Sequence, residues 1–223
     1  MTYEQIRCDE EIRAYIEKAD AALSALGYTE HNRAHVCRVA EEAGRILTSL
    51  GYSQIEIELA KIAGYMHDIG NVINRHDHCQ TGAVMAFSLL RDRGFDARDI
   101  ADMITAIGNH DEGAGTPVSA IAAALIIADK SDVRRSRVRN SDRSTFDIHD
   151  RVNYSVEKST LSINEEKTLL TLSLAIDTTI GSVSDYFEIF LERMLLCRRA
   201  AECLGLRFSL VVNTQVLMKS LKR

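Results

Sequence analysis

The stretch AGYMHDIGN, residues 63–71, ends an apolar helical pattern with a histidine and an aspartate side by side, His67 and Asp68. A carboxylate at this end of a helix is unfavourable, because the helix dipole places partial negative charge there. Either the pair is solvated and carries no special role, or a positive group faces it. The rest of the sequence decides between these two interpretations.

Helical periodicity surrounds this stretch on both sides. Apolar residues recur at intervals of three and four, as on the buried face of an amphipathic helix. Residues 53–56 form a capping box that starts the helix leading to His67. The spacing predicts six helices: 9–26, 30–50, 53–67, from near His78 to Gly94, from Asp96 onward, and from Pro117 to about residue 139.

The periodicity changes from three and four to two near residue 150. Apolar residues alternate at Val152, Tyr154 and Val156, and again over residues 170–176, which is typical of strands. The sequence NEEK, 164–167, predicts a hairpin turn between them. A helix over residues 183–204 and a short strand in LRFSLVVN, 206–213, follow.

These patterns predict a mainly α protein with two parts. A helical bundle occupies residues 1–145, and a small α+β unit of order β-β-α-β occupies residues 146–223. The composition supports this interpretation, since a single proline, twelve glycines and no tryptophan suit a helical protein better than an all-β one.

Charge and cysteine content limit the partners and the location. A net charge of −5 gives no general attraction to nucleic acid or to an anionic membrane. The five cysteines are odd in number and form no C-x-x-C, which favours reduced thiols. No apolar run approaches the roughly 20 residues of a membrane span. We expect a cytoplasmic protein without a membrane partner.

Six polar residues occupy core-facing or helix-end positions of the predicted bundle. Asp129 directly follows the apolar run AALIIA, and a buried carboxylate without a partner costs several kcal/mol. A single histidine at such a position is more often a hydrogen-bonded core residue than a ligand. The set together predicts one convergent site: His35, His67, Asp68, His78, His110 and Asp129.

Imidazole and carboxylate groups without thiolate suit iron, manganese, or zinc with open positions. Six ligands exceed what one catalytic ion uses while leaving room for water and substrate. Two divalent ions bridged by Asp68 fit better, at a separation of about 3.5–4 Å. Manganese and iron are the preferred candidates, and magnesium, nickel and zinc are alternatives.

At these residues the sequence resembles the HD-domain metal-dependent phosphohydrolase superfamily, specifically its six-ligand, two-metal branch. The resemblance covers about residues 29–139, in HNRAHVCRVAEEAG, YMHDIGN, HCQTGA, IGNHDEG and IIADKSD. It implies an all-α HD fold, the six residues above as ligands, and hydrolysis of a phosphoester, often of a nucleotide. The branch that cleaves cyclic dinucleotides has lysine at Asn71 and histidine at Asn109, so that substrate is not expected.

The predicted reaction is hydrolysis of a phosphoester or phosphoanhydride by a metal-bridging hydroxide, on a small, nucleotide-like substrate. Guanidinium groups are well shaped for phosphate, although the RRSRVR segment also fits a solvated helix end. The assigned roles are catalytic for Asp68 and Lys130, substrate-binding for Lys130, Arg134, Arg135 and Asn71, and support of the metal ligands for His31 and Asp111.

Two other functions fit the same residues. Some proteins of the HD fold carry this ligand set around two irons and act as oxygenases on small organic substrates. A third interpretation is a non-catalytic module that binds a nucleotide, with the C-terminal unit signalling or forming a homodimer. The intact ligand set argues against this last one.

Overall fold

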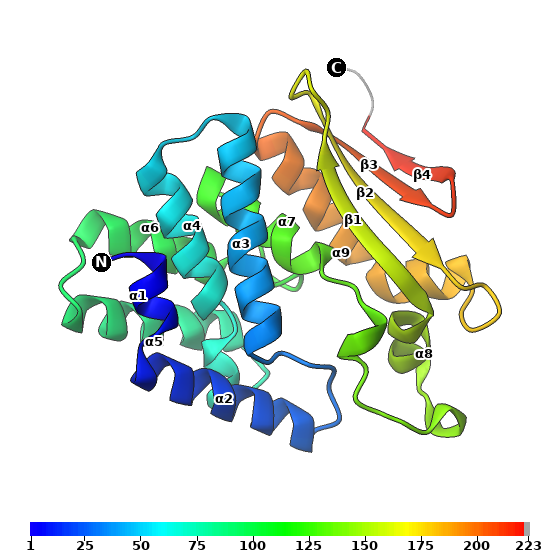
Figure 1. The fold of residues 1–223 in the computed structure, drawn as a ribbon, viewed down its shortest axis with the longest axis horizontal. Helices are drawn as coiled ribbons and strands as arrows, with labels where there is room; N and C mark the ends of the chain where they lie inside the picture. Colours follow the sequence, from blue (N-terminus) through cyan, green and yellow to red (C-terminus); the bar gives the residue numbers. More distant parts are fainter. Residues whose placement is uncertain (221–223) are drawn as a thin grey trace.

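Helix α7 (Ala120–Ser131) lies at the centre of the fold. Its residues from Ile121 to Ala128 are all buried, and a helix that is apolar on every side is stable only when other elements surround it. The computed structural model describes residues 1–220 and is shown in Figure 1. The helices packed around α7 are α3 (Arg33–Leu50), α4 (Gln54–Met66), α6 (Ala97–Gly108) and α9 (Val183–Cys203).

Shorter helical elements complete the first part of the chain. Side-chain caps fix several helix starts: Asp9 caps α2, Asn32 caps α3, and Ser53 caps α4 in the predicted capping box. No helix in residues 1–220 is long and apolar enough to cross a membrane. The remaining elements of this part are α1 (Tyr3–Arg7), α2 (Glu10–Ala25), the 3₁₀ turn η1 (Ile69–Val72) and α5 (His78–Asp92).

Two glycines allow the close approaches that position the polar residues. A Cβ on Gly64 would lie 2.8 Å from Cα of Ala40, so α3 and α4 are in backbone contact there. A Cβ on Gly70 would lie 2.0 Å from the carbonyl oxygen of His78. Only glycine permits this packing of η1 against the start of α5.

The C-terminal part contains a four-stranded sheet in the order β1-β2-β3-β4. The pairs β1–β2 and β3–β4 are antiparallel, and β2–β3 is parallel, with α9 as the crossover between them. Short helical elements precede the sheet. The bounds are η2 (Arg135–Arg137), η3 (Arg143–Thr145), α8 (Ile148–Ser155), β1 (Val156–Ile163), β2 (Leu169–Ile176), β3 (Arg207–Val212) and β4 (Gln215–Lys219).

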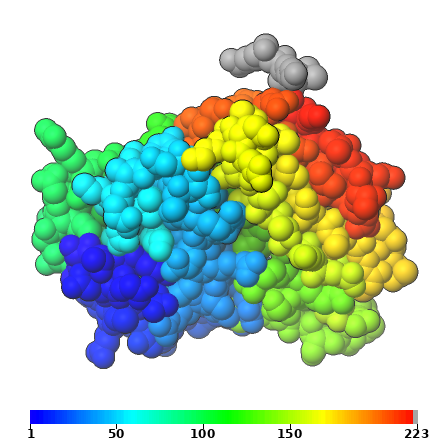
Figure 2. All heavy atoms as spheres, turned by 45° about the horizontal axis from the view of Figure 1, so that its top comes forward, coloured from blue at the N-terminus to red at the C-terminus, as the bar shows by residue number. Residues whose placement is uncertain are grey.

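One face of the sheet packs on α9. Leu170 and Leu172 of β2 pair in register with Phe208 and Leu210 of β3, and all four are fully buried. On the other side α9 packs on α7, so it lies between the sheet and the helical part (Figure 1). In the space-filling view the first hairpin, in yellow, lies against the blue and cyan helices (Figure 2), and Arg45 of α3 donates a hydrogen bond to the Leu161 carbonyl. The buried core is therefore continuous between the two parts, and the boundary near residue 145 stays a prediction.

The fold class is confirmed: a mainly helical chain with a small C-terminal sheet. Three local expectations were wrong. Residues 152–155 are helical, because Val152 and Val156 are also four apart, a helical spacing. The sixth helix begins at Ala120 behind the cap Ser119 and ends at Ser131, well before residue 139. A fourth strand, β4, makes the C-terminal unit β-β-α-β-β.

Candidate metal centre

The predicted ligands converge on the end of α4, where Asp68 is central. Its Oδ2 lies 3.2 Å from Nε2 of His67 and 3.6 Å from Nε2 of His35. Its Oδ1 lies 3.5 Å from Nε2 of His78 and 4.0 Å from Nε2 of His110. Each carboxylate oxygen of Asp68 therefore faces its own pair of imidazoles.

Asp129 closes the group from α7. Its Oδ1 lies 3.4 Å from Nε2 of His35 and 3.7 Å from Nε2 of His67. His35 and His67 thus lie between the two carboxylates, and all six predicted ligands meet in one place. The apolar packing of α7, α3 and α4 fixes this arrangement, because each polar group continues a buried face.

The second nitrogen of each imidazole is already bonded. Nδ1 of His67, His78 and His110 contacts the backbone carbonyl three residues earlier, at 2.8, 3.0 and 2.7 Å. Nδ1 of His35 contacts Oδ2 of Asp132 at 2.8 Å. When Nδ1 donates, the lone pair of Nε2 is free, and such outer bonds are usual for metal-binding histidines. All four Nε2 atoms lie within 4.0 Å of an Asp68 oxygen, and Nε2 of His78 also lies 3.3 Å from Nη1 of Arg75 and 3.2 Å from Nε2 of His110.

Three buried atoms of this group fit a bound cation. Within residues 1–220, Nε2 of His35, Nε2 of His67 and Oδ2 of Asp68 are buried and have no hydrogen-bond partner. Unpaired buried polar atoms are costly, and a divalent ion would satisfy all three. The sets whose ligand atoms lie within 4.8 Å of one another are His35–His67–Asp129, His67–Asp68–His110 and His78–His110–Asp111.

Asp132 was not among the predicted residues. It is 3 % exposed, bonds His35, and pairs with Arg38, Arg134 and Arg137. These partners outweigh its burial and hold the pKa of its carboxyl well below the usual range. The sequence signal was its position three residues after Asp129 in IIADKSD.

Asn71 was predicted to bind substrate. In the structure its side chain contacts Asp68. Its Nδ2 donates to Oδ1 and to the backbone carbonyl of Asp68, both at 2.9 Å, and the residue is 2 % exposed. Arg75 donates to the Asn71 side-chain oxygen at 3.4 Å. Asn71 therefore orients the central carboxylate.

Lys130 is buried beside the ligands in a network of acids. Its Nζ lies 2.8 Å from Oδ2 of Asp129 and 2.5 Å from Oε2 of Glu112, and 3.7 Å from Oδ1 of Asp111. Burial opposes its charge, but Asp129 and Glu112 raise the pKa of Lys130 above its ordinary value. Arg193 of α9 binds the other oxygen of Glu112 at 3.2 Å. Lys130 is therefore a cation at neutral pH.

A small cavity of about 20 Å³, called here the inner cavity, opens above the ligands. Three arginines that the sequence analysis did not identify line it. The predicted Arg134 and Arg135 do not: Arg134 pairs with Asp132, and Nε of Arg135 donates to the Tyr154 carbonyl at 2.6 Å. The cationic lining consists of Arg75, Lys130, Arg137 and Arg193.

The two residues predicted to support the ligands also line the inner cavity. The His31 ring packs edge-on against the His35 ring with centroids 5.5 Å apart, and its Nδ1 contacts the Thr29 carbonyl at 2.7 Å. Asp111 is partly exposed and lies 4.0 Å from Arg75. His31 thus packs against the ring of His35, and Asp111 lies near the cations Arg75 and Lys130.

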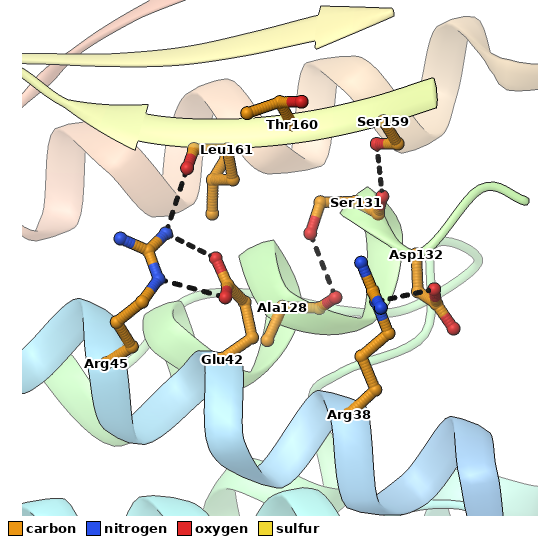
Figure 3. Close-up of a pocket in the computed structure, with 9 residues that line it drawn as sticks. All are labelled: Arg38, Glu42, Arg45, Ala128, Ser131, Asp132, Ser159, Thr160 and Leu161. Atoms are coloured by element: carbon orange, nitrogen blue, oxygen red, sulfur yellow. Dashed lines mark hydrogen bonds and ion pairs between the residues drawn. The ribbon is translucent and has the colours of Figure 1, made fainter. Parts of the chain in front are cut away.

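A separate pocket of about 200 Å³ lies between α3, α7 and β1 (Figure 3). Its polar groups are engaged with one another. Arg45 binds Glu42, Arg38 binds Asp132, and Ser159 donates to the Ser131 carbonyl. This pocket connects the outer surface to Asp132 but shares no lining residue with the inner cavity.

The chain is similar to known proteins over the segment that builds this centre. Residues 33–136 match the model of the HD domain family and contain all six predicted ligands. Over 213 residues the chain is 24 % identical to the uncharacterised protein MJ1020 of Methanocaldococcus jannaschii, covering 85 % of this chain and 80 % of that protein. A predicted HD superfamily hydrolase from an uncultured Thermotogales bacterium, known from a crystal structure, is 28 % identical in sequence to this chain. The match covers 56 % of this chain and 67 % of that chain, with a TM-score of 0.45.

Proposed function

Because the chain belongs to the HD-domain superfamily through residues 33–136, we propose that it is a metal-dependent phosphohydrolase acting on a phosphoester or phosphoanhydride. The observation that carries this proposal is the cationic lining of the inner cavity next to the histidine–aspartate group. A phosphate needs positive charge on the side away from the metals, and four cationic side chains are available there. An oxygenase acting on an uncharged substrate has no such need.

The residues that would hold the metal ions form two groups, one at each carboxylate oxygen of Asp68. Its Oδ2 side carries two imidazoles and the Asp129 carboxylate, and its Oδ1 side carries the other two imidazoles. This division supports two ions, with manganese or iron preferred for a nitrogen and oxygen donor set. When bound, the ions supply a water of lowered pKa as nucleophile and neutralise phosphoryl oxygens.

The chain itself positions the reacting groups. Asn71 fixes the orientation of Asp68, and Asp132 fixes that of the His35 ring. Lys130 is held beside Asp129 and Glu112, so its charge is preorganised next to the phosphate position. Burial of these groups limits water around them, which strengthens their electrostatic effect.

The test combines metal analysis with a substrate panel. Protein purified gently, and protein loaded with Mn²⁺ or Fe²⁺, is analysed for metal content and assayed on phosphomonoesters, phosphodiesters and nucleotides. His110→Asn and Asp129→Asn should lose both metal and activity, whereas Asp102→Asn, on an exposed residue of α6, should lose neither.

Two results would contradict the proposal. One is a protein that retains metal but cleaves no member of the panel. The other is oxygen uptake by the iron-loaded protein with no phosphate release, which would favour the oxygenase. Metal content near zero after gentle purification would favour the non-catalytic module.

A further inference from the structure

A second, larger space adjoins the inner cavity. This outer chamber has a volume of about 500 Å³, and it shares His31, Arg75, Arg137 and Arg193 with the inner cavity. Sites for small organic molecules are commonly about 300–1,000 Å³ in volume. The two spaces therefore form one site with a narrow inner end and a wide outer end.

The walls of the outer chamber come from segments far apart in the sequence. The loop of residues 26–29, between α2 and α3, forms one side. Helices α8 and α9 form the other, with Ile189, Phe190 and Arg193 contributed by α9. The C-terminal part of the chain thus supplies a wall of the chamber that leads to the metal centre.

Arg193 links that wall to the metal centre. Its Nε and Nη2 lie 3.3 and 3.2 Å from Oε1 of Glu112, whose other oxygen binds Lys130. Its guanidinium also lies 4.5 Å from the centre of the Phe190 ring. These contacts fix the guanidinium at the junction of the two spaces, and within residues 1–220 its Nη1 makes no hydrogen bond. That N–H group is therefore available to a ligand.

The charge of the inner cavity favours a dianion. Four cationic side chains and three carboxylates line it, and Glu112 and Asp132 pair with three of the cations, so the excess positive charge would come from the bound divalent ions. A phosphomonoester carries more negative charge than a phosphodiester at neutral pH. The inner cavity is also small, about 20 Å³, and shares no lining residue with the pocket of Figure 3. It has no room for an organic substituent, so a terminal phosphoryl group would lie at its mouth, where it meets the outer chamber.

The outer chamber has the character of a site for a flat organic group. The rings of Phe190 and Tyr28 line it, and Tyr28 is 44 % exposed. The carboxylates of Asp147 and Asp150, at the start of α8, line the same chamber and can accept hydrogen bonds. Aromatic surfaces with a few acceptors suit a ring system that carries N–H or O–H donors.

We propose that α9 forms the specificity wall of the substrate site. The substrate is a phosphomonoester whose phosphate contacts Arg193 at the junction of the inner cavity and the outer chamber. Its single organic substituent, a nucleoside-sized ring compound, lies against Phe190 in the outer chamber. This inference rests on the proposed phosphohydrolase function and adds the class of substrate and the two residues that select it.

The experiment uses the full-length, Mn²⁺-loaded protein and the variants Phe190→Leu and Arg193→Gln. Leucine keeps the apolar volume of a residue that is only 4 % exposed but removes the flat ring. Leu191→Ala and Arg199→Gln are matched controls on exposed positions of the same helix. Equilibrium dialysis measures binding of adenosine and of inorganic phosphate, and kinetics compare adenosine 5′-monophosphate, methyl phosphate and bis(p-nitrophenyl) phosphate.

Phe190→Leu should weaken adenosine binding and raise KM for the nucleotide by roughly fivefold or more. Phosphate binding and methyl phosphate turnover should change by less than about twofold, because the bonds of Arg193 to Glu112 remain. Arg193→Gln should weaken phosphate binding by about tenfold and lower turnover of both monoesters. Both controls should match the wild type.

The specificity wall and the phosphohydrolase function can be refuted separately. If monoesters are cleaved but the variants bind and react as the controls do, the specificity wall is refuted and the phosphohydrolase function stands. Faster cleavage of the diester than of the monoesters would refute the assignment of a single substituent. If no ester is cleaved, the proposed function fails, and the dialysis results alone decide whether the two residues bind phosphate and a nucleoside-sized ring.

Discussion

Replacing Asp132 by asparagine tests whether the histidine–aspartate group is a metal centre. Asp132 is 3 % exposed, and its Oδ2 accepts from Nδ1 of His35 at 2.8 Å. Asparagine keeps the shape and can still present an oxygen to His35. It removes the negative charge that orients the imidazole ring of His35 and makes its Nε2 more basic. Loss of such an outer partner typically weakens metal binding by about 10–100-fold, or roughly 1.4–2.7 kcal/mol.

The same substitution has a separate cost in folding. Asp132 also neutralises Arg137, which is 5 % exposed and donates to its backbone carbonyl. Leaving that guanidinium with less compensation should lower the free energy of unfolding by about 1–3 kcal/mol. The loss of metal affinity must therefore be measured well below the melting temperature of the variant.

The assay is titration of the metal-free protein with Mn²⁺ at 20 °C, followed by electron paramagnetic resonance of the free ion, with circular dichroism to verify folding. Asp102→Asn, on an exposed residue of α6, is the matched control and should bind as the wild type does. A folded Asp132→Asn protein whose Mn²⁺ affinity stays within twofold of the control would refute the role assigned to the His35–Asp132 contact.

Three further predictions follow from the same site. Lys130→Gln removes a buried cation that two partly buried carboxylates share, so it should lower the free energy of unfolding by about 3 kcal/mol in chemical denaturation; a loss below 1 kcal/mol would contradict the network. Gly70→Ala should displace His78 and abolish tight Mn²⁺ binding in dialysis, whereas Gly108→Ala, whose Cβ has an ordinary 3.6 Å contact, should bind normally. Saturating metal at about 100 times its Kd should stabilise the wild type by about 2.7 kcal/mol in thermal melts, less at pH 5 because protons compete for the imidazoles, and no shift at pH 7.5 would count against a metal centre.

The convergence of the ligands could be predicted because each ligand continues an apolar face. His35 begins the buried stripe of α3, and Asp129 follows that of α7, so the period of the helix directs both side chains inward. A buried carboxylate needs a positive group or hydrogen-bond donors beside it. Asp129 is therefore expected to lie close to the histidines, although they are distant in the sequence. The phase of each helix determines this inward direction, and the angle between helices does not enter it.

Asp132 and Arg193 could not be predicted in this way. Asp132 follows the last residue of α7, and its ψ of 67° lies outside the helix, so the helical phase no longer gives its direction. Arg193 lies in α9, and its approach to Glu112 depends on how α9 crosses α7. Such contacts depend on how the helices are arranged in space, and the periodicity of a single helix does not determine that arrangement.

The errors in the C-terminal part have local causes. Val152 and Val156 fit both periods, and the cap Asp147, which accepts from the backbone N–H of Asp150, decides for the helix. Strand β4 follows a turn in which Asn213 and Thr214 both have positive φ, the geometry of a type I′ hairpin. Glycine is the usual signal for that turn, and its absence concealed the hairpin.

The position of α9 connects the sheet to the chemistry of the site. The parallel pair β2–β3 requires a crossover, and α9 is that crossover, so the register of the sheet fixes where the helix begins and ends. Its opposite side, with Cys197 and Ala200 fully or almost fully buried, packs against α7. Since α7 carries Asp129 and Lys130, a change in the sheet that shifts α9 would move Arg193 relative to both. The sheet is therefore a structural support of the site, although within residues 1–220 no strand residue lines the inner cavity or the outer chamber.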